Sequence, residues 1–260
     1  LRVGIGGPVG SGKTALCEEP RAAAEENARR ARHLGDVVDY VRWQALRASP
    51  GQTLVITYKS CEPAFLGIPG VLTTHYNAIA GLDGYKNVRR IILVGRPLPG
   101  SSDLAKLTGG LLGQDISGRY MSDLKAVRMR DGPSRTVRVL GHSDPTGDLI
   151  RAAICDDELI QAVGRGRGVN RTAATLLDVH ILADVALPLV HDTVTAWELV
   201  APDVFQKMLL AGVAVDSPAD AVALHPDQFG TANQAKLVFQ RAGFKGETSY
   251  KDPLREMTLK

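Results

Sequence analysis

The stretch that decides the fold is GGPVGSGKTAL, at residues 6–16. Positions 7–14 match the pattern G-x-x-x-x-G-K-T, in which glycines let backbone N–H groups surround a phosphate and the following helix N-terminus adds to the anion site. RVGIG, at residues 2–6, predicts the strand that must precede such a loop. We therefore expect a bound nucleoside triphosphate, with Lys13 on its β- and γ-phosphates and Thr14 on Mg²⁺. The predicted nucleotide contacts are Gly7, Gly10, Ser11, Gly12, Lys13 and Thr14.

Outward from this loop, the chain alternates between apolar strands and helices. Branched and apolar residues predict strands at 53–59, 71–74 and 90–94, and the run LLDVHILADVALPL, from Leu176, predicts a further buried strand. Strands that are apolar almost throughout are typical of a parallel sheet covered on both faces. We therefore expect an α/β fold of the P-loop NTPase or RecA-like type, a parallel sheet with helices on both faces and a small C-terminal helical extension.

Helices are expected between these strands. Pro20 is predicted to interrupt the helix that follows the phosphate loop, and two separate helices are predicted within 21–47. Asp148 or Asp156 is expected to cap a helix that runs through ELIQAV. The polar segment 115–148 is expected to consist mainly of loops with a short hairpin that includes RTVRVL.

Composition excludes some classes of protein. No apolar run among the 260 residues approaches the roughly 20 needed to cross a bilayer, so no membrane partner is expected. The net charge of +3 permits a nucleic-acid partner without requiring one. Cys17, Cys61 and Cys155 form no CxxC pair, which argues against a zinc ribbon, and their small, odd number fits the reducing cytoplasm. The N-terminus lacks the features of a signal peptide, and the first residue, Leu1, indicates a trimmed chain or a fragment.

The opening LRVGIGGPVGSGKTAL, residues 1–16, resembles the start of UreG, the GTPase that delivers nickel to urease. This resemblance implies GTP as the nucleotide and nickel and urease as partners. UreG-type proteins also have a Cys-Pro-His metal motif downstream, and this sequence lacks that triplet. It also lacks the guanine-reading pattern Asn-Lys-x-Asp, so the choice between ATP and GTP stays open.

A P-loop enzyme usually also needs an acidic residue at the end of another strand to organise Mg²⁺. Asp184, in VHILADV, is the candidate for this second metal contact. Asp156, Asp157 and Glu158 offer an alternative, but an acidic helix N-terminus, which complements the helix dipole, is the favoured interpretation of that cluster.

The segment ELIQAVGRGRGVNRT, residues 158–172, places arginines on a turn after a helix. Its Gln161, Gly164, Arg165 and Arg167 resemble motif VI of superfamily 2 helicases, Q-x-x-G-R-x-x-R, with the last arginine one position early. The resemblance implies that Gln161 senses the nucleotide and that Arg165 or Arg167 stabilises the charge on the transferred phosphoryl group. A basic loop that is simply solvated, or that contacts nucleic-acid phosphates, is the alternative.

Two further stretches resemble helicase motifs in the expected order. Thr74, Gly81 and Asp83 occupy the T…G-x-D positions of motif V, and TLVITYK, residues 53–59, is similar to motif IV, which opens the second RecA-like lobe. Most of residues 35–260 is similar to the C-terminal part of helicase- or primase-like replication proteins of plasmids and phage-derived elements. That similarity implies a first lobe that is missing here or supplied by a partner subunit, and a join between the two similarities within 16–27.

These observations favour a helicase-like, ATP-hydrolysing protein that acts on single-stranded or duplex DNA. The resemblance implies Thr74 near the nucleic-acid backbone. In the last predicted helix, Lys236 and Arg241 are candidate nucleic-acid contacts, and the alternative is that they lie on the solvated face of a packing helix. ATP or GTP and Mg²⁺ are the expected cofactors. Three parts are predicted: a P-loop segment at 1–34, a RecA-like lobe at 35–200 and a small helical extension at 201–260. The alternatives are a UreG-like nickel chaperone and a non-catalytic nucleic-acid-binding module.

Overall fold

The computed structural model describes residues 2–5, 20–48, 51–78 and 84–243. The phosphate-loop residues predicted to bind the nucleotide, Gly7 to Thr14, therefore lie outside the described residues, as do Gly81 and Asp83 of the motif V resemblance. Contacts between residues divide the chain into two compact units, 1–200 and 201–260, and each unit is described by itself.

A parallel sheet of six strands forms the centre of the first unit. Its order is β3-β2-β4-β7-β1-β9, and every neighbouring pair is parallel. The strands are β1 (Arg2–Ile5), β2 (Thr53–Thr57), β3 (Val71–His75), β4 (Arg90–Val94), β7 (Asp178–Leu182) and β9 (Thr193–Ala196). The expected α/β class with a mostly parallel sheet is therefore confirmed.

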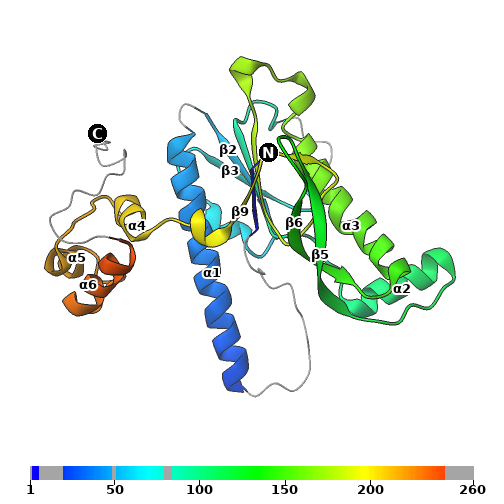
Figure 1. Cartoon of the computed structure of the whole chain (residues 1–260), viewed down its shortest axis with the longest axis horizontal. Coiled ribbons are helices and arrows are strands. Elements are labelled where there is room, and N and C mark those ends of the chain that lie inside the picture. The colour runs from blue at the N-terminus through cyan, green and yellow to red at the C-terminus, as the bar shows by residue number, and fades with distance from the viewer. Residues whose placement is uncertain (1, 6–19, 49–50, 79–83, 244–260) are drawn as a thin grey trace. The chain divides into compact units, whose positions relative to one another are not determined.

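Helices cover both faces of this sheet because successive strand residues point to opposite sides. Ile91 and Leu93 of β4 belong to a core that contains Leu159 and Ala162 of α3 (Pro145–Gly164). Ile92 and Val94 of the same strand belong to a second core, formed with Val37 and Val41 of α1 (Pro20–Arg47). Figure 1 shows the strands between these two helices.

Helix α1 differs from the prediction in its length, while the helix that Pro20 was predicted to interrupt lies outside the described residues. It is one helix of 28 residues that begins at Pro20 and continues through Gly35, where two separate helices were predicted. Proline is compatible with the first turn of a helix because its missing N–H has no partner there in any case. Pro20 therefore starts this helix.

An antiparallel hairpin occupies most of the segment that was predicted to be loops. It consists of β5 (Tyr120–Met129) and β6 (Arg135–His142), and a short strand, β8 (Val190–His191), pairs with β5. The predicted hairpin was correct, but its strands are longer than expected because the alternation of apolar and polar residues extends through KAVRM as well as RTVRVL. The helix α2 (Ser101–Leu112) precedes it.

Helix α3 begins earlier than predicted. Its N-cap is Asp144, whose carboxylate accepts hydrogen bonds from the N–H groups of Thr146 and Gly147. Asp148 and Asp156 therefore lie inside the helix, and neither caps it. Helix α3 runs for 20 residues and ends at Gly164, next to Arg165, Arg167 and Arg171, which we call the arginine cluster.

The second unit is a small cluster of helices: α4 (Val204–Leu210), α5 (Pro218–Leu224) and α6 (Ala232–Arg241). Phe205, Met208, Phe229 and Phe239 form the centre of its own apolar core. Short 3₁₀ turns complete the described chain at Glu62–Phe65, Gly168–Asn170, Ala173–Thr175 and Trp197–Leu199. Among the described helices, none combines the length and apolar character required to cross a membrane.

Candidate functional site

The parallel sheet has two distinct edges, which we call the amino edge and the carboxyl edge after the ends of the strands that lie there. Residues 165–175 follow α3 and lead into β7, and residues 84–87 lead into β4, which is the neighbour of β7. Both segments therefore meet at the amino edge. The arginine cluster of the sequence lies at this edge.

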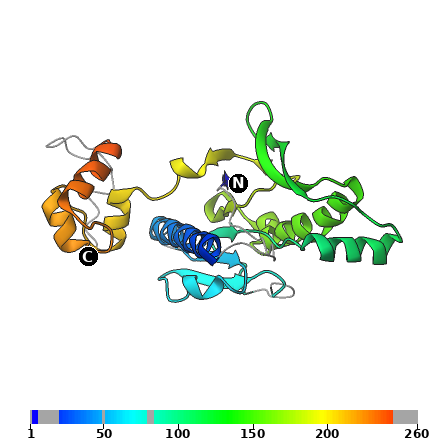
Figure 2. The same ribbon diagram turned by 90° about the horizontal axis from the view of Figure 1, so that it is seen from below.

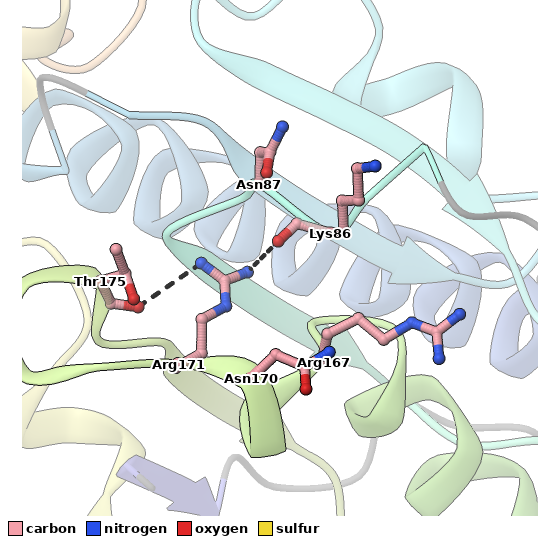
Figure 3. A pocket seen from close by; sticks show the side chains of 6 residues that line it. All are labelled: Lys86, Asn87, Arg167, Asn170, Arg171 and Thr175. Carbon is pink, nitrogen blue, oxygen red and sulfur yellow. Dashed lines mark hydrogen bonds between the residues drawn. The ribbon is translucent and has the colours of Figure 1, made fainter.

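A pocket of about 410 Å³ lies where these segments meet. Its described lining includes three cationic side chains, from Lys86, Arg167 and Arg171, and among the described residues no carboxylate lines it. Asn87, Asn170 and Thr175 complete the lining with amide and hydroxyl groups. Figure 3 shows Arg171 between the two segments, with Lys86 and Arg167 on one side of it. A pocket with this lining favours an anionic ligand.

Arg171 ties the two segments together. Its guanidinium donates hydrogen bonds to three backbone carbonyl oxygens: Lys86 at 2.6 Å, Gly166 at 2.9 Å and Thr175 at 3.5 Å. These partners are neutral, so the positive charge of Arg171 is not cancelled by them. Arg171 therefore holds together the segments that line the pocket and also contributes to its positive electrostatic potential.

Arg167 is held in an unusual backbone conformation at the rim of the pocket. Its φ is +52°, in the left-handed region that residues with a Cβ rarely adopt. The neighbouring Gly166 is buried so closely that an added Cβ would lie 2.2 Å from Leu177 Cδ2. Close packing of Gly166 against the core fixes the turn that places Arg167 in the lining of the pocket.

The other two predicted motif VI residues do not line the pocket. Gln161 is exposed on the last turn of α3, and Arg165 lies one turn further along the chain. The Nε of Arg165 is buried and has no hydrogen-bond partner among the described residues. Of the two arginines between which the sequence could not decide, Arg167 is the one that faces the pocket.

At the carboxyl edge, Asp184 follows β7, the neighbour of β1, and in sequence β1 is followed by the predicted phosphate loop. Asp184 is therefore at the edge expected for a residue that organises Mg²⁺. It is engaged, however, in an ion pair with the buried Arg96, with 3.0 Å between Oδ1 and Nε. Burial raises the pKa of Asp184, and the neighbouring Arg96 opposes that rise. A role in metal binding would require this pair to open.

Three tyrosine hydroxyls fasten the loop that follows β4 at the same edge. Tyr58, Tyr76 and Tyr120 donate to the carbonyl oxygens of Arg96, Gly95 and Pro99, at 2.6, 2.8 and 2.8 Å. Tyr58 Oη also accepts from the Arg96 N–H at 2.8 Å. The chain is therefore held rigidly beside the Arg96–Asp184 pair.

Acidic side chains of α3 are engaged by partners within the fold. Arg151, which is nearly buried, binds Asp148 at 2.6 Å and Asp156 at 2.9 Å. Glu158 accepts a hydrogen bond from the N–H of Asn77 at 2.9 Å. The favoured interpretation of Asp156, Asp157 and Glu158 as a helix start is wrong, because these residues lie in the second half of α3.

The residues predicted to contact nucleic acid belong to both units. Thr74 lies within β3 and is only 6% exposed, so its side chain offers little to an external partner. Lys236 and Arg241 are exposed on α6 of the second unit. Sequence reasoning missed Lys86 and Asn87, although the GYKN turn before a strong strand marked the place where a chain reaches the amino edge.

Comparisons of the chain with protein-family models, with curated proteins and with solved structures found no match. Within the ranges that the structure describes, no group of three or more His, Cys, Asp or Glu side chains is arranged to hold a metal ion.

Proposed function

We propose that this chain is a helicase-like nucleotide-hydrolysing protein that acts on DNA, with its arginine pocket completing a nucleotide site. The observation that carries the proposal is the pocket lined by Lys86, Arg167 and Arg171, whose lining contains no carboxylate from any residue that the structure describes. Its volume of about 410 Å³ is within the range of small-ligand sites and can accept the phosphates of a nucleotide.

The position of the pocket determines which nucleotide it can serve. The phosphate loop leaves β1 at the carboxyl edge, whereas the pocket lies at the amino edge of the same sheet. A strand of five residues separates the edges by about 17 Å. We therefore propose that the pocket receives the phosphates of a nucleotide held by another P-loop, in a first lobe or in a second copy of this chain.

Arg167 has the chemical role of a finger in this proposal. Its guanidinium would neutralise charge on the transferred phosphoryl group, while Arg171 holds the pocket in shape. Lys86 would add a second charge to the same phosphates. ATP or GTP with Mg²⁺ would be the cofactor, with Lys13 and Thr14 of the other copy holding the phosphates.

Phosphate release from ATP and from GTP, with Mg²⁺ and with single-stranded or duplex DNA, tests the proposal. Arg167→Gln is expected to lower kcat by about 10³-fold because it removes the finger charge. Arg165→Gln is expected to change kcat much less, since Arg165 does not line the pocket. Arg32→Gln, at an exposed site on α1, is the control for loss of one positive charge.

A mixing experiment tests whether the site forms between copies. Lys13→Ala and Arg167→Gln should each be inactive alone, and their mixture should recover hydrolysis because a hybrid site combines an intact phosphate loop with an intact arginine. Failure to recover, when each variant is folded and the unaltered chain is active, would contradict a site shared between copies.

The same measurements separate the alternatives. Nucleotide binding without hydrolysis, unaffected by Arg167→Gln, would indicate a non-catalytic nucleic-acid-binding module. A preference for GTP together with tight binding of Ni²⁺ would indicate a UreG-like nickel chaperone.

A further inference from the structure

The β5–β6 hairpin has one buried face and one exposed face. Val127, Met129, Val137 and Val139 form the buried face and pack with Ala186 and Val194. Alternate residues of the two strands point the other way, and five of them are exposed: Ser122, Leu124, Ala126, Thr136 and Arg138. Arg128 continues this exposed face toward the turn. The hairpin therefore presents a two-stranded ribbon to the surroundings of the first unit (Figures 1 and 2).

The positive charge of the chain is concentrated in this hairpin. Residues 119–142 contain six Arg and Lys side chains and two Asp side chains. The whole chain has 31 basic and 28 acidic side chains, so the remainder carries a slight excess of acid. The mildly basic character of the chain is thus a local property of this hairpin.

Partners within the fold engage only some of these cations. Lys125 pairs with Asp148 at 3.0 Å, Arg130 pairs with Asp192, and Arg135 donates to the Val194 carbonyl at 3.2 Å. Arg128 and Arg138, on the exposed face, make no ion pair with any residue that the structure describes. The two arginines that point outward are therefore available to an external anion.

Their spacing is set by the hairpin register. Arg138 lies opposite Leu124, and Arg128 comes four residues after Leu124 on the same strand. Four residues of antiparallel strand span about 13 Å, which places the two guanidiniums far enough apart to contact separate phosphates. The side chains between them, Ala126 and Thr136, are small and permit close approach of a partner.

We propose that the exposed face of the β5–β6 hairpin binds duplex DNA through Arg128 and Arg138. This surface identifies the DNA contact of the proposed function, on which it rests, and it shares no residue with the arginine pocket. The major groove of B-form DNA is wide enough for a two-stranded ribbon, whereas the major groove of A-form RNA is too deep and narrow. DNA duplex is therefore the partner that fits a flat, basic ribbon.

The base of the hairpin is fixed, which favours such a role. Tyr120 donates to the Pro99 carbonyl, and the Leu140 carbonyl accepts from Arg96 at 3.1 Å. A ribbon that is already ordered loses little conformational freedom when it binds.

Fluorescence anisotropy of a labelled DNA duplex of about two helical turns, measured from 50 to 200 mM salt, tests this surface. The double variant Arg128→Gln/Arg138→Gln is expected to bind about 60-fold more weakly at 0.1 M salt and to reduce the slope of log K against log salt by about 1.8, as loss of two phosphate contacts predicts. The matched control, Arg32→Gln/Lys106→Gln, removes the same charge from exposed sites elsewhere in the first unit and should leave both quantities within about twofold.

Equal affinity and equal slope for the two double variants would overturn the proposal. An RNA duplex of the same sequence that binds as tightly as DNA, with the same sensitivity to Arg128→Gln/Arg138→Gln, would overturn the groove assignment. Nucleotide hydrolysis separates this inference from the proposed function, because the hairpin variant should keep its basal ATPase activity without DNA. DNA binding lost in this variant, in a chain that never hydrolyses nucleotide, would support the hairpin surface and contradict the proposed function.

Discussion

Gly166 is expected to be the one glycine of the GRGRG sequence at 164–168 that the fold requires. A Cβ at this position would lie 2.2 Å from Leu177 Cδ2 and 2.9 Å from Ile91 Cδ1. Carbon atoms cannot approach so closely, so both side chains would have to move. Ile91 is fully buried, whereas the end of the half-buried Leu177 has room to turn. We expect Gly166→Ala to destabilise the first unit by about 2 kcal/mol, within the usual cost of overpacking.

The flanking glycines supply matched controls. A Cβ at Gly164 or Gly168 would meet no atom within 4 Å. Gly168→Ala should be nearly neutral, and Gly164→Ala should be neutral or slightly stabilising, because Gly164 is the last residue of α3 and alanine favours helix.

Urea unfolding followed by tryptophan fluorescence measures the effect in the correct unit. Both tryptophans of the chain, Trp43 and Trp197, lie in the first unit, so the signal does not report on the second. With a slope of about 2 kcal/mol per molar urea, the expected loss lowers the midpoint by about 1 M. A Gly166→Ala midpoint equal to that of Gly168→Ala would refute the close packing of this turn.

Two further predictions concern the rest of the first unit. Gly95 has a φ of +75°, and a Cβ added there would lie 2.4 Å from a ring carbon of Tyr58, whereas Gly67 has a φ of +79° and open space around it. Gly95→Ala should therefore lower the free energy of unfolding in urea by about 1–3 kcal/mol more than Gly67→Ala. Equal losses would contradict the close packing of Tyr58 on Gly95. Burial raises the pKa of Asp148, but hydrogen bonds from Arg151, the His142 N–H and Lys125 outweigh burial and hold that pKa well below its usual value. Because the pKa is lower in the folded state, ionised Asp148 stabilises the fold above the unfolded value of 3.8, and this stabilisation is lost as pH falls below that value. Asp148→Asn should therefore flatten the decline of thermal stability between pH 5 and about pH 2. An unchanged decline would contradict the role of these bonds.

The fold class was predictable because the decisive strands are apolar on both faces. RIILV and TLVIT have no polar alternation, and β4 and β2 are indeed buried throughout. The start of α3 was predictable in principle, since Asp144–Pro145 places a capping residue before a proline at the first helical position. The strand order was not predictable, because nothing in β1 specifies that β7 and β9 are its neighbours.

The same limit applies to the candidate site. Arg167 and Arg171 were found because they lie in one short basic segment. Lys86 joins them from a position some eighty residues earlier, and only the pairing of β4 with β7 brings it to the pocket. The sequence also could not show that the described lining residues include no carboxylate, because the lining depends on how the fold brings distant segments together.

The left-handed backbone of Arg167 has a consequence for how this protein would evolve. Glycine adopts that conformation without strain, so Arg167→Gly would be expected to relax the turn by roughly 1 kcal/mol while removing a cation from the pocket. Selection for stability alone would thus tend to replace this arginine with glycine. Its retention among related chains would therefore indicate that the guanidinium is preserved for recognition of a ligand.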